Sequence, residues 1–229
     1  MSVEVRGPHQ RFRTDAEGRT TWHSFSFGSH YDPTNTGFAQ LVALNEENLP
    51  RHNGYAPHPH QGLEIVTLVL DGALEHRSDV GSGVITPGGV QRLSAGRGVI
   101  HAELNASTGP TRFLQAWVSS DQPEREPEYL SGRVGTSTGW SLIAGGGDSV
   151  LPIRAAMEMW VANPDAGQEL QLPDRSAMLL HVATGSIRLA GSAISAGGEI
   201  RLMDEGGRNL HCISPDTTLA LWAVSPVGR

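Results

Sequence analysis

The segment that decides the fold reads HPHQGLEIVTLVLDGALEHRSDVGSG over residues 58–83 and continues as PGGVQRLSAGRGVIHAE over residues 87–103. Short apolar runs rich in Val, Ile and Leu alternate with glycine-centred turns such as Asp71-Gly72. This alternation is typical of strands in a sandwich or barrel, and it predicts a β domain.

The same pattern continues on both sides of this segment, and no long amphipathic helix interrupts it. Seven strands are predicted in the first half, at residues 38–44, 63–70, 73–77, 83–86, 90–94, 101–105 and 113–118. Six more are predicted in the second half, at residues 140–144, 155–162, 177–182, 186–189, 200–203 and 218–224. The chain is therefore expected to be all-β.

A polar stretch separates the two groups of predicted strands. Residues 119–133 (SSDQPEREPEYLSGR) are charged and contain two prolines, so they hold too little apolar surface to form a core. We predict an N-terminal domain at residues 1–120, a linker at 121–139 and a second β domain at 140–229.

Two motifs of the first half recur in the second. LVLDGALEHR and VITPGGVQRL (residues 68–77 and 84–93) are echoed by HVATGSIRLA and AISAGGEIRL (residues 181–190 and 193–202). The turn glycines of the two copies coincide, and duplication of one small barrel is the simplest explanation.

Histidines and carboxylates gather at both ends of the deciding segment. His58 and His60 would point to one side of a strand, and Glu64 shares their parity. About forty residues later, His101 and Glu103 repeat the same spacing. Because two such pairs can meet only through folding, they are candidate ligands of one metal ion.

Imidazole nitrogen and carboxylate oxygen suit divalent Fe, Mn, Co, Ni, Cu or Zn. Four such ligands on an octahedral ion leave two positions for water, dioxygen or substrate, whereas a closed tetrahedral structural zinc site leaves none. Thiolate ligation is not expected, because the single cysteine, Cys212, lies outside this barrel. The residues alone leave the metal and its coordination number open.

The other histidines are expected to be surface or hydrogen-bonded structural residues: His9, His23, His30, His52, His76, His181 and His211. In the second copy the positions equivalent to the first histidine pair fall near Gln171 and Pro173. His211 has no clustered histidine partner there, so no metal is expected in the second domain.

Composition excludes several classes of function. The net charge is −7, and all 17 basic residues are arginine, so neither a basic nucleic-acid surface nor lysine Schiff-base chemistry is expected. No apolar run approaches the length of a membrane helix, and no secretory signal is recognised at the N-terminus. One cysteine agrees with a reducing cytoplasm.

The deciding segment resembles the pirin branch of the cupin superfamily, which includes bacterial flavonol dioxygenases of the quercetinase type. WHSFSFGSHYDPTNTGF (residues 22–38) also resembles the opening of its bacterial members. The resemblance implies two cupin barrels in tandem, each a jelly-roll-like double-stranded β-helix. It also implies one metal, commonly iron, held by His58, His60, His101 and Glu103, with Glu64 outside the ligand set.

The resemblance further implies a metal-dependent dioxygenase that cleaves a flavonol-like phenolic substrate with O2. Glu103 would be both a ligand and the base that takes the substrate's hydroxyl proton. The alternative is a non-enzymatic, metal- or redox-responsive regulator that binds a protein partner. A cytoplasmic monomer without direct nucleic-acid or membrane binding is expected in either case.

Overall fold

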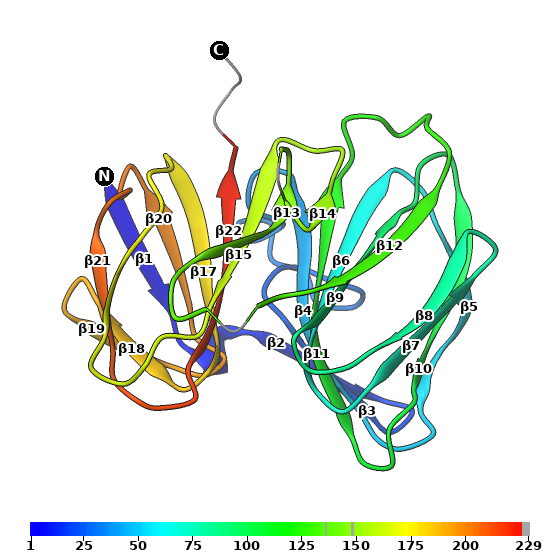
Figure 1. Cartoon of the computed structure of the whole chain (residues 1–229), viewed down its shortest axis with the longest axis horizontal. Helices are drawn as coiled ribbons and strands as arrows, with labels where there is room; N and C mark the ends of the chain where they lie inside the picture. The colour runs from blue at the N-terminus through cyan, green and yellow to red at the C-terminus, as the bar shows by residue number, and fades with distance from the viewer. Residues whose placement is uncertain (136, 148, 226–229) are drawn as a thin grey trace. The chain divides into compact units, whose positions relative to one another are not determined.

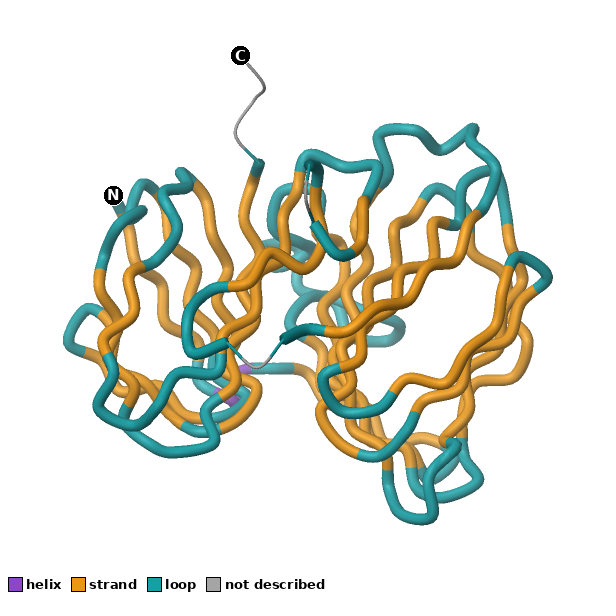
Figure 2. Tube along the Cα trace, in the orientation of Figure 1, coloured by secondary structure: helices purple, strands orange, loops and turns teal. Residues whose placement is uncertain are grey.

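The computed structural model describes residues 1–135, 137–147 and 149–225. Its regular structure consists almost entirely of strands (Figure 2), and the helical element among the described residues is one 3-10 turn, η1 (Pro8–Gln10). The all-β prediction is confirmed. No helix in the described part of the chain is long and apolar enough to span a membrane. Residues 136, 148 and 226–229, which fall in the predicted linker and second domain, lie outside the described residues.

The chain forms two compact units. We call Phe12–Val134 with Val150–Ala155 the histidine unit, and Met1–Arg11, Gly135–Ser149 and Ala156–Arg229 the apolar unit. The strands of the histidine unit are β2 (Phe12–Ala16), β3 (Arg19–His23), β4 (Leu41–Leu49), β5 (Gly54–His60), β6 (Leu63–Asp71), β7 (Leu74–Ser78), β8 (Gly81–Ile85), β9 (Gly89–Ser94), β10 (Val99–Asn105), β11 (Thr111–Ser119), β12 (Glu128–Arg133) and β14 (Leu151–Pro152). Those of the apolar unit are β1 (Ser2–Arg6), β13 (Ser141–Gly145), β15 (Met157–Ala162), β16 (Glu169–Gln171), β17 (Ala177–Thr184), β18 (Ser186–Leu189), β19 (Ser192–Ser195), β20 (Glu199–Met203), β21 (Asn209–Cys212) and β22 (Thr218–Val224).

The two units repeat one topology (Figure 1). In the histidine unit one sheet has the order β12-β9-β6-β11-β4-β3-β2, and the other has the order β5-β10-β7-β8. In the apolar unit the corresponding orders are β1-β20-β17-β22-β15-β13 and β16-β21-β18-β19. Strand for strand, β4 to β11 match β15 to β22, which supports duplication of one small barrel.

The turn glycines of the two copies have the same structural role. Gly72 and Gly185 have φ angles of 76° and 73°, a region that L side chains rarely adopt. A Cβ on Gly72 would lie 2.5 Å from the carbonyl oxygen of Pro110, and one on Gly185 would lie 2.2 Å from Oγ1 of Thr217. Both turns therefore require glycine, because the backbone is left-handed at these residues and a segment distant in the sequence approaches closely.

Each unit has a core between its two sheets. In the histidine unit, one buried cluster joins Leu49, Val69 and Phe113 of the larger sheet to Leu74 and Ile85 of the smaller one. In the apolar unit a single larger cluster spans both sheets and includes Leu180, Ile187, Leu210 and Leu221. In both units, burial of the alternating apolar side chains on the inner faces stabilises the packing of one sheet against the other.

The predicted strands all overlap observed ones, but several strands were not predicted: β1, β2, β3, β5, β12, β14, β16, β19 and β21. These strands are mostly short and polar, and many of their side chains are exposed. The most important of them is β5, whose sequence GYAPHPH contains two prolines and no apolar run. Proline at the edge of a sheet is tolerated because no ladder donor is needed on the outer side.

The compact units divide the chain differently from the predicted domain boundaries. Residues 1–11 lie in the apolar unit, where β1 pairs with β20. Within the predicted linker, β12 pairs with β9 and alternates exposed residues with half-buried ones such as Tyr129. A polar edge strand needs little apolar surface, so composition alone did not reveal it. The boundaries 1–120, 121–139 and 140–229 of independently folding domains stay a prediction.

Replacement of Gly54 by Ala should destabilise the histidine unit. The added Cβ would lie 2.2 Å from the carbonyl oxygen of Glu103 and 2.9 Å from Cα of Leu104, so β5 and β10 would have to separate. We expect a loss of about 1–3 kcal/mol in the free energy of unfolding, measured by denaturant titration. Gly109→Ala is the matched control, because its Cβ meets nothing within 4 Å. Equal stability of the two variants would contradict the tight β5–β10 contact.

Candidate metal centre

Strands β5 and β10 bring the four predicted ligands to one region of the histidine unit. The strands are antiparallel neighbours, and His58 pairs directly with His101. His60 pairs with Val99, and the register shifts between His101 and Glu103. Two chain segments about forty residues apart thus meet through one strand pairing.

The three imidazoles of His58, His60 and His101 form a close group. Their ring centroids are 4.9 Å apart for His58 and His60, 4.4 Å for His58 and His101, and 5.0 Å for His60 and His101. One nitrogen from each lies within 4.8 Å of the others. The spacing of the group is suitable for three ligands of a single ion.

The hydrogen bonds of this group leave one ring nitrogen of each histidine available to a metal. Nδ1 of His58 lies 2.8 Å from the carbonyl oxygen of Ala56, to which it donates, so Nε2 of His58 carries the lone pair. Nε2 of His60 and Nε2 of His101 are buried, and neither has a hydrogen-bond partner among the described residues. Such orphaned buried atoms call for an explanation. A divalent cation accepting three nitrogen lone pairs satisfies them, so the residues fit a metal.

Burial also keeps two of these imidazoles, those of His60 and His101, neutral. It lowers the pKa of His60 to about 4, with a smaller contribution from His58. It lowers the pKa of His101 to about 2, and the neighbouring histidines add to the effect. Neutral imidazole is the metal-binding form, so these two rings are ready to bind at neutral pH.

Glu103 adjoins His101 without joining the three-histidine group. A carboxylate oxygen of Glu103 lies within 4.8 Å of a ring nitrogen of His101 and one of His76, and these three buried residues form a second group that shares His101 with the first. Both groups could hold an ion. The four-ligand centre of His58, His60, His101 and Glu103 stays a proposal.

Two glutamines hold the Glu103 carboxylate. Nε2 of Gln115 donates to its two oxygens at 3.0 and 2.9 Å, and Nε2 of Gln91 donates to Oε1 at 3.2 Å. Each amide is itself oriented, because Oε1 of Gln115 accepts from the indole of Trp117 and Oε1 of Gln91 accepts from the hydroxyl of Tyr129. Burial raises the pKa of Glu103 to about 7, opposed by the Gln115 hydrogen bond.

Glu64 lies in neither group, and its predicted parity with the histidines is wrong. Gly62, with a φ angle of 67°, forms a turn that separates β5 from β6, so side-chain alternation does not continue from His60 to Glu64. The buried Glu64 carboxylate accepts hydrogen bonds from the hydroxyls of Ser94 and Ser120. Its polar partners are therefore serines.

Sequence reasoning missed His76, Gln91 and Gln115. His76 was assigned to the structural histidines, yet it is fully buried and belongs to the second group. Its signal was the alternation of β7, in which the exposed Arg77 implies that its neighbour His76 faces inward. The glutamines stand in apolar strands, at positions where a buried amide needs a polar partner.

A cavity of about 300 Å³ opens beside the histidine group. His58, Glu103 and Gln115 contribute to its wall, and Phe27 and Trp117 add aromatic surface. The remaining lining is Thr14, Ala16, Arg19, Thr21, His23, Gly28, Ser29, Asn45, Glu47 and Tyr55. The cavity gives a small molecule access to the candidate ligands.

The comparisons with known proteins agree with this geometry. The family model described as Pirin matches residues 6–118. A candidate quercetin 2,3-dioxygenase of Mycobacterium tuberculosis is 37% identical over 233 residues, which cover 96% of this chain and 94% of the relative. The chain belongs to the pirin family. A quercetin 2,3-dioxygenase of Escherichia coli is 28% identical over 231 residues, covering 98% of this chain and all of the relative.

The fold is that of a solved pirin. The crystal structure of the bacterial pirin YhhW from E. coli in complex with nickel(II) superposes with a TM-score of 0.90 at 26% identity, covering 99% of this chain and 100% of that one. The prediction of two cupin barrels in tandem is thereby confirmed.

The apolar unit has a different interior at the corresponding strands. There β16 pairs with β21, and Glu169 stands opposite His211. Leu170 and Leu210 are buried in the core cluster, while Glu169 is exposed. Among the residues that the structure describes, both histidine groups belong to the histidine unit. The absence of a second metal site stays a prediction.

In the metal-free protein, Glu103 should make the free energy of unfolding fall as pH rises. Its pKa rises from 4.5 in the unfolded chain to about 7 in the fold, so the stabilising contribution of the protonated form is complete below pH 4.5 and is lost as pH rises to 7. Across this pH interval, the free energy of unfolding of the wild type should fall by on the order of 3 kcal/mol relative to that of Glu103→Gln. Urea titrations of both proteins in chelator at several pH values measure the difference. Parallel pH profiles would contradict a buried, destabilised carboxylate.

Proposed function

We propose that this pirin is a metal-dependent dioxygenase that cleaves a flavonol-like phenolic substrate with O2 at a centre of three histidines and one glutamate. The names of the E. coli and M. tuberculosis relatives support the reaction class. Nickel(II) in the E. coli pirin supports a divalent metal. The family resemblance favours iron, with Ni, Co, Mn, Cu and Zn as the alternatives.

One observation carries the proposal: the cavity wall contains candidate ligands. His58 and Glu103 line the same hollow as Phe27 and Trp117. The ring centroids of Phe27 and Trp117 are 5.2 Å apart in an edge-on arrangement, and Trp117 also contacts His60 edge-on at 4.7 Å. A flat aromatic substrate in this cavity would pack on these rings with a hydroxyl beside the ligands.

A bound divalent metal would supply Lewis acidity and access to one-electron chemistry. The protein's own contribution begins with Glu103, which takes the proton of the substrate's enol or phenol hydroxyl. Gln115 and Gln91 hold that carboxylate in place from two sides. Phe27 and Trp117 exclude water from the reacting face.

The wall formed by β3, β4 and β5 is polar and suits a substrate with several hydroxyl groups. Oε2 of Glu47 accepts from Oγ1 of Thr21 at 2.6 Å and from the hydroxyl of Tyr55 at 2.7 Å. Nδ1 of His23 lies 2.9 Å from Oδ1 of Asn45. These donors and acceptors could recognise ring hydroxyls away from the reacting one. They favour a polyphenol over a hydrocarbon.

Iron- or nickel-loaded protein should consume O2 and release carbon monoxide when quercetin is added under air. Glu103→Gln should lower turnover by about 10²- to 10⁴-fold, because the proton acceptor is lost. Oxygen uptake, carbon monoxide release and metal content are measured together.

Glu64→Gln is the matched control, because it changes a buried carboxylate that hydrogen-bonds to serines in the same unit. It should retain metal and turnover. Full turnover and full metal content in Glu103→Gln would sink the assignment of Glu103. No turnover by the loaded wild type would favour the regulatory alternative.

A further inference from the structure

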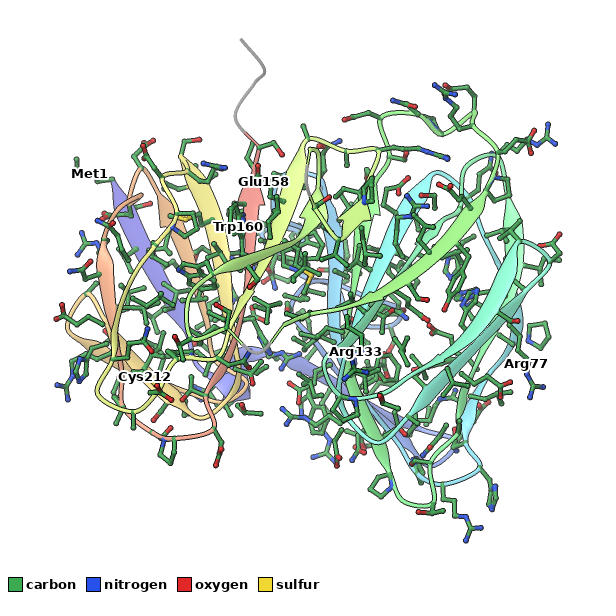
Figure 3. All side chains as sticks on the ribbon, viewed as in Figure 1. Met1, Arg77, Arg133, Glu158, Trp160 and Cys212 are labelled. Atoms are coloured by element: carbon green, nitrogen blue, oxygen red, sulfur yellow. The ribbon has the colours of Figure 1, made fainter. Side chains whose placement is uncertain are left out.

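A buried histidine outside the three-histidine group, His76, adjoins the proposed ligand His101. His76 lies in β7, the strand that pairs with β10 on the side away from β5, and its register partner is Glu103. Arg77 and Glu75 form an ion pair on the outer face of β7, and the labelled Arg77 extends outward in Figure 3. Alternation therefore turns His76 and its second neighbour Ser78 toward the interior.

Two contacts link His76 to its surroundings. Nδ1 of His76 lies 3.3 Å from Nδ1 of His101, and Nε2 of His76 lies 3.1 Å from Oγ of Ser78. Oγ of Ser78 also donates to the carbonyl oxygen of Gly81 at 2.8 Å. These contacts form a chain that runs from a backbone carbonyl to a metal-ligand ring.

The donors along this chain can be assigned in one order. A hydroxyl has one proton, and Ser78 gives it to Gly81, so Ser78 accepts from Nε2–H of His76. A neutral imidazole has one N–H, so Nδ1 of His76 is an acceptor. It accepts from Nδ1–H of His101, which leaves Nε2 of His101 unprotonated. That nitrogen is the buried one without a hydrogen-bond partner among the described residues.

We propose that His76, oriented by Ser78, is a positioning residue that fixes His101 as its Nδ1–H tautomer and so presents Nε2 of His101 to the metal. The inference rests on the metal centre of the proposed function and is independent of the reaction performed there. Hydrogen bonds of this kind fix both the tautomer and the ring orientation of a ligand histidine.

Tyr129 holds the His76 ring in place. The two rings are stacked, with centroids 4.4 Å apart and an interplanar angle of 8°. Tyr129 has two further contacts. Its hydroxyl donates to Oε1 of Gln91, and Gly81 packs so closely on its ring that a Cβ added to this glycine would lie 2.8 Å from the ring. Strands β8 and β9 therefore confine the aromatic ring of Tyr129, against which His76 stacks.

The alternative hypothesis is that His76 is itself a metal ligand. With Nδ1 unprotonated, His76 could bind an ion together with His101 and Glu103, whose ligand atoms lie within 4.8 Å. The Nδ1 atoms of His76 and His101 are 3.3 Å apart, so an ion held by both would require the Nδ1 lone pair of His101, which the hydrogen-bond chain assigns to a proton. An ion at that pair of atoms and the proposed hydrogen-bond chain thus predict opposite protonation of His101.

The test uses full-length, metal-free protein labelled with ¹⁵N-histidine. Long-range ¹H–¹⁵N correlation spectra should show His101 protonated at Nδ1 and His76 protonated at Nε2. A His101 ring that carries its proton on Nε2 overturns the proposal. This arm needs neither metal nor substrate, so its outcome is separate from that of the flavonol assay.

A second arm measures nickel(II) affinity by competition with a chromophoric chelator. His76→Leu, which can neither accept nor donate, should weaken binding by about 10- to 100-fold. His76→Gln keeps one acceptor and one donor and should recover most of the affinity. Ser78→Ala should shift the tautomer ratio of His76 and weaken binding by a smaller factor. His211→Leu removes a histidine of the apolar unit and should bind as the wild type does.

Wild-type affinity in a folded His76→Leu protein would overturn the proposal, as would two nickel ions per wild-type chain with loss of one in that variant. If His76→Leu does not fold, Ser78→Ala decides the matter. Unchanged tautomer ratios of His76 and His101 in Ser78→Ala, with unchanged nickel affinity, reject the chain of hydrogen bonds.

Discussion

The pairing of β5 with β10 is the constraint on which the site depends. It sets His58 opposite His101 and brings two histidines from one strand within reach of a histidine and a glutamate from the other. The approach is close enough that Gly54 has no room for a side chain beside the Glu103 backbone. Ligands on two hydrogen-bonded strands are held in fixed relative positions, because the paired backbone is rigid.

The two units show what duplication can keep and what it can lose. The strand order and the left-handed turn glycines are common to both units. The interiors differ, because leucines of β16 and β21 belong to the core cluster, whereas the corresponding strands β5 and β10 contribute His58 and Glu103 to a cavity wall. A barrel therefore does not depend on its polar centre for folding. Nε2 of His60 and Nε2 of His101 are buried without a hydrogen-bond partner among the described residues, and such atoms cost stability unless a ligand satisfies them.

Sequence reasoning worked where the physical signal was local. Apolar alternation located the inner strands, and glycines such as Gly72 located their turns. It failed for β5, since two prolines and an absence of apolar residues hid a strand that backbone pairing defines. It also failed for Glu64, because one glycine turn reset the side-chain parity. The burial of His76 could be inferred from strand alternation, but the roles of His76 and of the two glutamines were out of reach for a different reason. Their roles depend on partners from other strands, and no spacing along the chain encodes which nitrogen faces which oxygen.

Strand β12 extends the part of the polypeptide that the site requires beyond the segment that contains the proposed ligands. All four proposed ligands precede residue 104, so a protein cut after the first run of strands would keep every one of them. It would lose the phenol that steers the Gln91 amide and the aromatic face against which His76 rests. Exchange of barrels between relatives, whether by recombination or by design, would accordingly have to carry this polar edge strand along with the ligands that precede it in the chain.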